Sequence, residues 1–390
     1  MKFRLLAFAL MLPALPLLAG DWAVHRGNAT QTGVSDEKLP EKLALRWEYK
    51  TRNSVESAAV IADGIVYAAS SDKHLYAIDL KTGTLKWKTP GEGPEFCFGT
   101  VVFDLMTERL RPNAFFSIFT ASPGVNGNRL YVGDADGKFF CIDRATGNVL
   151  WAFDDDEQTG QISAAPNFDG DNILIPTQNS VLYCLNKNGK KLWDFRIEGP
   201  IYGGVAVADG KTYLAGCDSL MHAIDIKTGK ELGSVDLKGQ SGSAAAVFGD
   251  FLYVGTMSNQ VLAVNLKRMR IEWEFEAPKR KQSFYGSAAV DDELVVIGSR
   301  DSKVWAIDRK SGKRHWDYLT DNKVDGSAVI VGDRVFIGSY DKRFYVFDRK
   351  GKKVDEFELD GAIMGSPAVA DGCVVIGTDK GTVYCFGAKR

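Results

Sequence analysis

Acidic residues recur at regular intervals along the chain and are the first candidates for chemistry. Most follow a Ser or Gly by two positions, between two short apolar segments: Asp72, Asp136, Asp218, Asp301, Asp341 and Asp379. A ring of carboxylates could bind calcium, but an aspartate in a tight turn also hydrogen-bonds to its own backbone. Because the acids recur at one place in each segment, we interpret them as turn residues and predict no metal site.

Histidines and nucleophilic residues do not form a recognisable catalytic group. The four histidines are spread over the chain without a shared motif: His25, His74, His222 and His315. The Gly-Xaa-Ser-Xaa-Gly sequence of serine hydrolases is also absent. We therefore predict no catalytic residues.

The six cysteines are compatible with a fold that lacks disulfide bonds. Three of them occupy equivalent small, buried positions in different repeats, too far apart to bridge: Cys141, Cys184 and Cys385. The sequence leaves open whether the others pair after export: Cys97, Cys217 and Cys373. No cysteine and histidine cluster has the spacing of a metal site.

The elements that carry these residues are variations on one segment, residues 286–316. Within it, residues 295–297 and 304–307 are short apolar runs bounded by turn-forming residues, as in β-strands. Gly312 supplies the positive φ angle that the next tight turn needs. With two further strands, beginning near Gly286 and His315, the segment predicts one four-stranded antiparallel sheet.

The repeat period predicts a β-propeller. The third strand of each repeat ends in an aspartate or a substitute, at Asp79, Asp143, Asn186, Asp225, Asn265, Asp308, Asp348 and Gly387. Successive gaps are 39 to 43 residues, with a single gap of 64, and repeats of about forty residues suit four-stranded propeller blades. A tryptophan follows in five repeats, at Trp87, Trp151, Trp193, Trp273 and Trp316. It is absent near Gly233 and Phe357, so two blades must pack that position differently.

The two ends of the chain predict a closed ring. The last repeat has only three strands, and residues 45–50, which include Trp47, have the pattern of the missing fourth strand. Pairing these segments would leave no free terminal edge for aggregation. We predict an all-β fold, a single eight-bladed β-propeller of four-stranded antiparallel blades over residues 45–390.

Residues 1–20 have the features of a secretory signal peptide. Lys2 and Arg4 precede an apolar segment, and small residues precede Asp21. The apolar segment is short for a membrane span, and no cysteine near the cleavage site could carry a lipid anchor. We expect a periplasmic or extracellular monomer. A net charge of -2 gives no argument for binding nucleic acid or an anionic membrane.

Residues 21–44 form an extended leader before the first repeat. Its Trp22 lies beside polar and charged residues such as Arg26. An indole in such a segment usually packs its apolar body and keeps its polar tip wet. We expect Trp22 to anchor the leader on the surface of the ring rather than to bind a ligand.

The long gap places an insertion at about residues 91–119, between the first two blades. It contains six phenylalanines, with Arg109 among the charged residues between them: Phe96, Phe98, Phe103, Phe115, Phe116 and Phe119. A long insertion in a compact domain is usually functional or disordered, and six phenylalanines argue against disorder. It is either a flap packed on its own blade or a lid that binds a partner or covers a ligand.

The connections into the innermost strands gather a second set of candidates at one mouth of the central channel: Glu56, Thr120, Ile162, Tyr202, Tyr285, Asp325 and Met364. A concave site with aromatic walls and a few polar groups is the default ligand or partner site. The same residues could simply fill a narrow funnel. The sequence leaves both interpretations open.

Three repeats carry a family resemblance: VYAASSDKHLYAIDLKTGTLKW, LYVGDADGKFFCIDRATGNVLW and VVIGSRDSKVWAIDRKSGKRHW. They resemble the tryptophan-docking repeats of the pyrroloquinoline-quinone (PQQ) propeller superfamily over residues 45–387. That superfamily includes quinoprotein dehydrogenases and non-catalytic propellers such as outer-membrane assembly factors of the BamB type. The leader sequence DWAVHRGN is similar to that of exported PQQ-like repeat proteins.

The resemblance implies two different functions. In the dehydrogenases, a tryptophan and a vicinal disulfide hold the quinone next to calcium, and this chain has no adjacent cysteines. We therefore predict a non-catalytic, exported scaffold without a cofactor, which binds a protein or peptide through the channel mouth and the insertion. The alternatives are a quinoprotein dehydrogenase that uses PQQ and calcium, and a carbohydrate or small-ligand binder with Tyr202 and Tyr285 as stacking platforms. The missing lipid-anchor cysteine departs from the assembly-factor pattern.

Overall fold

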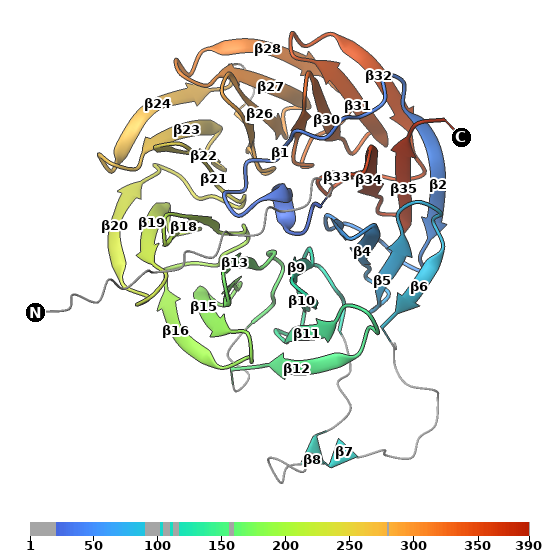
Figure 1. Cartoon of the computed structure of the whole chain (residues 1–390). Coiled ribbons are helices and arrows are strands. Elements are labelled where there is room, and N and C mark those ends of the chain that lie inside the picture. The colour runs from blue at the N-terminus through green and yellow to red at the C-terminus, as the bar shows by residue number, and fades with distance from the viewer. Residues whose placement is uncertain are drawn as a thin grey trace, which may run out of the picture.

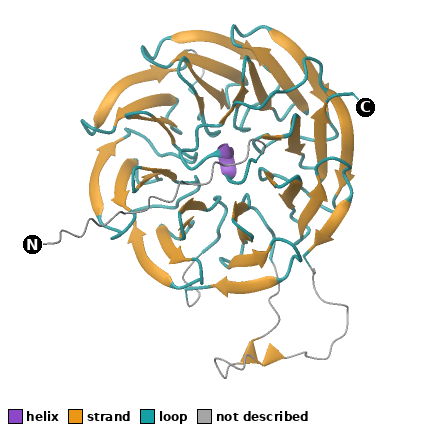
Figure 2. Ribbon diagram, in the orientation of Figure 1, coloured by secondary structure: helices purple, strands orange, loops and turns teal. Residues whose placement is uncertain are grey.

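Eight four-stranded antiparallel sheets surround a central axis (Figure 1). The computed structural model describes residues 21–89, 102–103, 110–111, 117–155, 160–278 and 281–389. In these ranges the only helix is η1 (His25–Gly27), a single 3-10 turn at the centre of the ring (Figure 2). The predicted eight-bladed β-propeller is confirmed.

Blades 1 to 4 consist, from the axis outward, of β3 (Val60–Ala62), β4 (Ile65–Ala69), β5 (Leu75–Asp79) and β6 (Leu85–Lys88); β9 (Gly124–Asn126), β10 (Arg129–Gly133), β11 (Phe139–Asp143) and β12 (Val149–Phe153); β13 (Asn167–Asp169), β14 (Asn172–Pro176), β15 (Val181–Asn186) and β16 (Lys191–Arg196); and β17 (Ala206–Ala208), β18 (Lys211–Ala215), β19 (Leu220–Asp225) and β20 (Glu231–Asp236).

Blades 5 to 8 consist of β21 (Ala246–Phe248), β22 (Phe251–Gly255), β23 (Gln260–Asn265) and β24 (Arg270–Glu276); β25 (Ala289–Val290), β26 (Leu294–Ser299), β27 (Lys303–Asp308) and β28 (Arg314–Leu319); β29 (Val329–Val331), β30 (Arg334–Gly338), β31 (Arg343–Asp348) and β32 (Lys353–Glu358); and β33 (Ala368–Ala370), β34 (Cys373–Gly377), β35 (Thr382–Gly387) and β2 (Ala44–Lys50).

The ring closes in blade 8, where the two ends of the chain share one sheet. Strand β2, from the N-terminal side, pairs antiparallel with β35, and Trp47 faces Cys385 in the register. The middle strands of every blade are almost completely buried, whereas the outer strands alternate between exposed and partly buried residues. This pattern places the core between neighbouring blades, as expected for stacked sheets that each bury two faces.

Six of the eight junctions between blades use the same tryptophan contact. Each indole Nε1 donates a hydrogen bond to a backbone carbonyl of the next blade: Trp47 to Leu80 (2.8 Å), Trp87 to Arg144 (3.0 Å), Trp151 to Lys187 (3.1 Å), Trp193 to Ile226 (2.7 Å), Trp273 to Arg309 (2.9 Å) and Trp316 to Arg349 (2.9 Å). Each indole also packs against a glycine in the turn that supplies the accepting carbonyl. At Gly312, a Cβ atom would come within 2.7 Å of the Trp273 indole. The tryptophans therefore join the blades to one another.

The leader differs from the prediction, because it lies inside the ring and not on its surface (Figures 1 and 2). Trp22 is 1% exposed and pairs with Ile61 of β3. Further along, leader carbonyls accept hydrogen bonds from inner-strand amides of five more blades: Val125, Val207, Val247, Val290 and Ile330. β1 (Val34–Ser35) then pairs parallel with β29. Inner strands leave an unpaired edge facing the channel, and the leader satisfies those edges.

The insertion branches off between β6 and β9. The structure describes two short strands within it, β7 (Val102–Phe103) and β8 (Leu110–Arg111), which pair with each other and with no blade strand. The predicted candidates Phe96, Phe98, Arg109, Phe115 and Phe116 lie outside the described residues. For Phe103 only the backbone is described. The predicted role of the insertion therefore stays a prediction.

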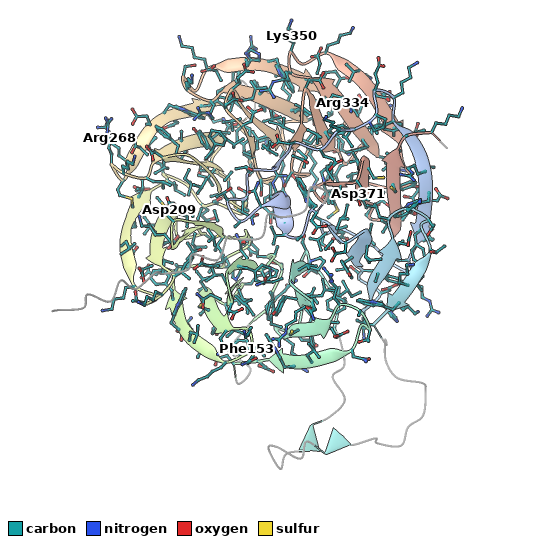
Figure 3. All side chains as sticks on the ribbon, in the orientation of Figure 1. Phe153, Asp209, Arg268, Arg334, Lys350 and Asp371 are labelled. Atoms are coloured by element: carbon teal, nitrogen blue, oxygen red, sulfur yellow. The ribbon has the colours of Figure 1, made fainter. Side chains whose placement is uncertain are left out.

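The outer strands of the propeller expose large apolar side chains as well as charged ones, among them Leu45, Leu150, Leu192, Leu232 and Leu319. Side chains such as those of Arg268 and Lys350 project away from the ring (Figure 3). Among the described residues, no helix has the length and apolar character needed to cross a membrane.

Candidate functional site

A funnel opens on the face where the connections enter the innermost strands. It encloses about 440 Å³. Six of the seven predicted mouth residues contribute to its wall: Glu56, Thr120, Tyr202, Tyr285, Asp325 and Met364. The short connections place them there because each precedes the first strand of its blade by a few residues. Ile162, by contrast, is fully buried beside Gly133 and is not part of the wall.

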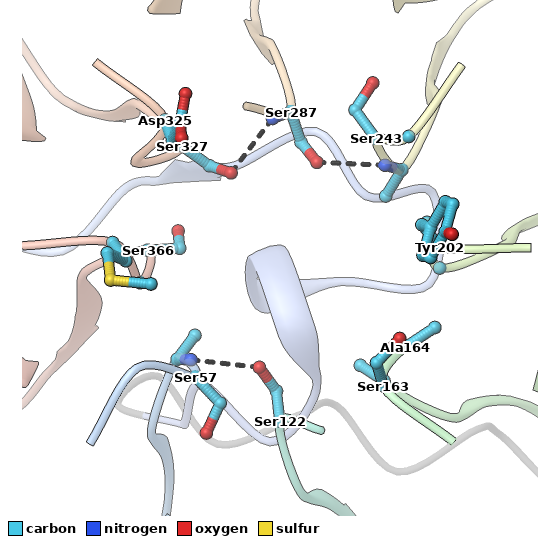
Figure 4. A pocket seen from close by; sticks show the side chains of 18 of the residues that line it. Ser57, Ser122, Ser163, Ala164, Tyr202, Ser243, Ser287, Asp325, Ser327 and Ser366 are labelled. Atoms are coloured by element: carbon cyan, nitrogen blue, oxygen red, sulfur yellow. Dashed lines mark hydrogen bonds between the residues drawn. The ribbon is translucent and has the colours of Figure 1, made fainter. Parts of the chain in front are cut away.

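A ring of serines lines the funnel (Figure 4). Seven blades place a serine just before the inner strand, and blade 4 has Gly203 there: Ser57, Ser122, Ser163, Ser243, Ser287, Ser327 and Ser366. Three of their hydroxyl oxygens accept a backbone hydrogen bond from the preceding blade: Ala58 N to Ser122 Oγ (3.0 Å), Ala244 N to Ser287 Oγ (3.0 Å) and Ser287 N to Ser327 Oγ (2.9 Å).

None of these serines is among the predicted site residues, although the sequence carries a signal for them. A Ser-Ala-Ala or related tripeptide recurs before the inner strands, for example at Ser287. The hydroxyl hydrogen of a serine remains available when its oxygen accepts a bond. The serine ring therefore presents several hydroxyl donors, which suit carbonyl or carboxylate oxygens of a ligand.

The leader closes the bottom of the funnel. His25 of η1 contributes to the wall, and its Nδ1 atom has no hydrogen-bond partner among the described residues. Burial, with a smaller effect of the Arg26 charge, lowers the pKa of His25 to about 3, so its imidazole is neutral at pH 7. The leader residues were not predicted as part of this site because their position inside the channel depends on long-range contacts.

Arg26 lies directly beneath the funnel and is completely buried. Its guanidinium donates to Ser366 Oγ (2.8 Å) and to the carbonyl oxygen of Ala288 (3.0 Å). No carboxylate forms an ion pair with Arg26 within the described part of the chain. Burial lowers the pKa of Arg26 to about 9, so the side chain still carries its charge at neutral pH. The bottom of the funnel is therefore electrostatically positive.

Arg300 and Lys323 both form ion pairs with Asp325 at the mouth. Arg300 makes two hydrogen bonds to Asp325, of 2.8 and 2.9 Å, and its guanidinium stands 4.4 Å from the centre of the Tyr285 ring. Lys323 lies 4.0 Å above the Tyr340 ring. The hydrogen bond to Asp325 raises the pKa of Arg300, and burial raises the pKa of Tyr340 to about 12. Asp325 and Tyr285 thus form part of a fixed wall, and one face of Tyr285 is covered by a cation.

The hairpin acids serve the turns, as predicted for most of them. Asp72 accepts hydrogen bonds from His74 N (3.1 Å), Arg52 N (2.9 Å) and the Tyr76 hydroxyl (2.6 Å). In blade 2 the assignment to Asp136 was wrong, because Asp134 accepts the turn bonds and Asp136 donates its amide to it. Throughout the described ranges, no three His, Cys, Asp or Glu residues are arranged to bind a metal ion.

A quinone with calcium does not fit the residues of this funnel. Its described wall contains neither a tryptophan nor a cysteine, and the leader fills the space below the serines. None of the funnel serines in the described chain hydrogen-bonds to a histidine, so a Ser-His nucleophile pair is also not assembled. Its described residues offer hydroxyl and amide groups that can bind a ligand.

Fold and site together define an eight-bladed propeller with tryptophan-docked blades and a polar funnel closed by its own leader. The family model described as outer membrane protein assembly factor BamB, of the PQQ-repeat type, matches residues 40–98, 99–196 and 178–390. The chain belongs to this family. The resemblance stated from the repeats is thereby confirmed.

The similar proteins include both outer membrane assembly factors and quinoprotein dehydrogenases. BamB from Xanthomonas campestris pv. campestris is 29% identical over 279 residues, covering 67% of this chain and 63% of the relative. Quinoprotein ethanol dehydrogenase from Pseudomonas putida is 26% identical over 173 residues, covering 43% of this chain and 24% of that enzyme. The chain thus matches less than two thirds of either relative. The crystal structure of BamB from Moraxella catarrhalis has a TM-score of 0.70 at 18% identity, covering 90% of this chain and 98% of that one, which supports the fold alone.

Proposed function

We propose that this protein is an exported, non-catalytic scaffold that binds a protein or peptide segment at the mouth of the funnel, as part of envelope protein assembly. The observation that carries the proposal is the serine ring, which presents hydroxyl donors in a funnel that assembles no catalytic pair among its described residues. Membership in a family described by an assembly factor agrees with it.

The chemistry of the funnel favours an extended peptide as its occupant. Main-chain carbonyl oxygens of an inserted loop can accept the serine hydroxyls, and the Arg26 charge below them favours a carbonyl or carboxylate end. A volume of about 440 Å³ accommodates the tip of a loop but not a folded domain. We propose that the tip enters the funnel while the insertion at residues 91–119 contacts the remainder of the partner.

Site-specific photocrosslinking tests the mouth as the binding surface. A photoreactive phenylalanine analogue would replace Tyr202 or Met364, both in the funnel wall, and Leu232, which is 54% exposed on the outer strand of blade 4, as the control. Irradiation of intact cells should give the same crosslinked protein from both mouth positions and not from Leu232. Crosslinks of equal strength from Leu232, or none from the mouth, would contradict the proposal.

Deletion tests the insertion separately. Removing residues 93–117 should leave the propeller folded, because β6 and β9 belong to different blades that are held by their own pairing. Thermal unfolding would confirm the fold of the variant. Loss of the crosslinked partner from a folded variant supports a role of the insertion in binding, whereas an unchanged crosslink assigns binding to the mouth alone.

The quinoprotein relatives justify one direct test of the alternative function. The purified protein would be mixed with PQQ and calcium and examined for a bound quinone absorbance and for alcohol-dependent dye reduction. The non-catalytic proposal expects neither signal. Stoichiometric quinone binding with dye reduction would replace it with a dehydrogenase function.

A further inference from the structure

The bottom of the funnel gathers buried polar atoms that have no partner. The leader turn η1 and the connections into blades 1 and 8 meet there, and His25, Ser57 and Ser366 line the cavity (Figure 4). Among the described residues, Ser57 Oγ and His25 Nδ1 form no hydrogen bond. Such groups are rare in folded proteins, and each calls for an explanation such as a bound water or ion. Both side chains are partly exposed, so a ligand in the funnel can reach them.

Close packing of two neighbouring connections brings the serines of blades 8 and 1 to one side of the cavity. The inner strands of these blades, β33 and β3, are in contact. Gly365 lies against the backbone of blade 1, and a Cβ atom on it would be 3.0 Å from the carbonyl oxygens of both Glu56 and Ser57. A larger residue would push the connections apart. Ser366, which follows this glycine, therefore stays close to Ser57.

Ser366 links the cavity to the buried charge of Arg26, which does not itself line the funnel. The oxygen of Ser366 accepts the Arg26 bond at 2.8 Å. Its hydroxyl hydrogen has one acceptor among the described residues, the carbonyl oxygen of Pro367 at 3.5 Å, which is longer than a normal bond between oxygens. Because linked hydrogen bonds polarise one another, a hydroxyl that accepts from a cation is a stronger donor. Ser366 therefore offers a strengthened donor to a ligand in the funnel.

The leader is shaped to keep the Arg26 charge buried. Gly33 N donates to the carbonyl oxygen of Arg26 at 3.0 Å, and a Cβ atom at Gly33 would overlap the Nη2 atom of Arg26. The glycine thus leaves room for the guanidinium. In the described part of the chain no carboxylate pairs with Arg26, and a buried charge without a counterion is costly. An anion that enters the funnel would offset part of this cost.

We propose that the bottom of the funnel is a carboxylate-binding site formed by Ser57, Ser366 and His25, with Arg26 supplying the positive charge. The two hydroxyls and the Nδ1–H tautomer of His25 donate to the carboxylate, whose two oxygens together accept up to about four bonds. A neutral carbonyl accepts the same donors but does not neutralise Arg26. The carboxylate comes from the C-terminal end of a peptide or from a free small acid, so the site does not depend on the proposed protein partner.

Nuclear magnetic resonance of the His25 ring tests this site in the purified mature protein at pH 7. The chain has four histidines, and a His25→Gln variant assigns the His25 signal. The probes are acetyl-trialanine with a free carboxylate, the same peptide as its amide, and acetate. Both carboxylates should shift the signal in a saturable way. The peptide acid should bind about tenfold more tightly than the amide, because hydrogen bonds to an ionised acceptor are stronger.

The two carboxylates distinguish the sources of the ligand. Tighter binding of the peptide acid than of acetate assigns the site to a chain end, and equal binding assigns it to a free small acid. Arg26→Gln should weaken binding of the peptide acid about tenfold and leave binding of the amide unchanged. Arg268→Gln, which removes an exposed arginine from the rim, should change neither. Ser57→Ala should weaken both peptides, and Ser258→Ala, an exposed serine outside the funnel wall, is its matched control.

Three results would overturn the proposal: no saturable shift of the His25 signal with either carboxylate, equal binding of peptide acid and amide, or an unchanged ratio of the two in a folded Arg26→Gln variant. If that variant does not fold, the ratio in the wild-type protein and its response to Ser57→Ala decide. A failure to crosslink a partner at the mouth would contradict the proposed function and leave these binding results as they are, because the probes are added to the purified protein.

Discussion

Gly233 in blade 4 faces the terminal methyl group of Met269 in blade 5, and a Cβ atom at Gly233 would lie 3.2 Å from that methyl group. At six other junctions a tryptophan faces a glycine of the next blade. Here the large and the small residue have exchanged blades. Met269 occupies the turn position that is glycine elsewhere and keeps the positive φ of that position, at 49°.

This exchange predicts a compensating pair of substitutions. Gly233→Trp alone should lower the free energy of unfolding by about 1 to 3 kcal/mol, because the indole collides with Met269. Gly233→Trp with Met269→Gly should restore stability to within about 1 kcal/mol of wild type. Denaturant unfolding of the two single variants and the double variant measures the coupling. Purely additive effects would show that the two residues do not share one space.

The junction that closes the ring should be as sensitive as any other. Trp47 is 8% exposed and bonds across the closure to Leu80, so Trp47→Ala should cost about 3 to 5 kcal/mol. Leu45→Ala, on the same strand but 50% exposed, should cost less than about 1 kcal/mol. Thermal and denaturant unfolding would measure both. A small effect of Trp47→Ala would mean that pairing of β2 with β35 closes the ring without the indole.

The repeat architecture could be read from the sequence because it depends on local patterns. Strand length, turn residues and the tryptophan spacing each recur every forty residues or so, and pairing of residues 45–50 with the last blade follows from counting strands. The mouth residues followed as well, since their place is set by the blade connections. The residues at the bottom of the funnel could not be predicted from the sequence. His25 and Arg26 reach it only because the leader threads along the inner strands of distant blades, which no short-range pattern encodes.

Acid should destabilise the fold through His25. Burial lowers the pKa of His25 from 6.5 to about 3, so the unfolded chain binds an extra proton as the pH falls from about 6.5 towards 3. The contribution of neutral, buried His25 to the free energy of unfolding is therefore fully present above about pH 6.5. It is lost progressively as the pH falls towards 3. Because the imidazole of His25 is partly accessible from the funnel, we expect the free energy of unfolding to fall by about 1 to 3 kcal/mol between pH 7 and pH 4.5 from this group.

The measurement is the difference between wild type and His25→Gln, which removes the titration but keeps a polar side chain. Unfolding free energies at pH 7 and pH 4.5 should diverge less for the variant than for wild type. Carboxylates that titrate at lower pH contribute equally to both proteins and cancel. Identical pH dependence of the two proteins would show that His25 is protonated without penalty in the folded state.

Arg26 should hold the leader in the channel. Its guanidinium bonds to Ser366 of blade 8 and to the carbonyl oxygen of Ala288 of blade 6, so it joins the leader to two blades. Arg26→Ala would leave the Ser366 hydroxyl and the Ala288 carbonyl without this donor, at a cost of about 1 to 3 kcal/mol. The carbonyls of Ala29, Thr30, Thr32 and Gly33 would then separate from the inner strands.

Hydrogen exchange measures that release directly, because the backbone amides of Val207, Val247, Val290 and Ile330 donate to those leader carbonyls. In Arg26→Ala these four amides should exchange faster, while amides of the middle strands keep their protection. Lys42→Ala, an exposed substitution between the leader and β2, should leave all of them unchanged. If the four amides stay protected in Arg26→Ala, the backbone bonds of the leader suffice to hold it, and the buried charge has a role in the funnel above it instead.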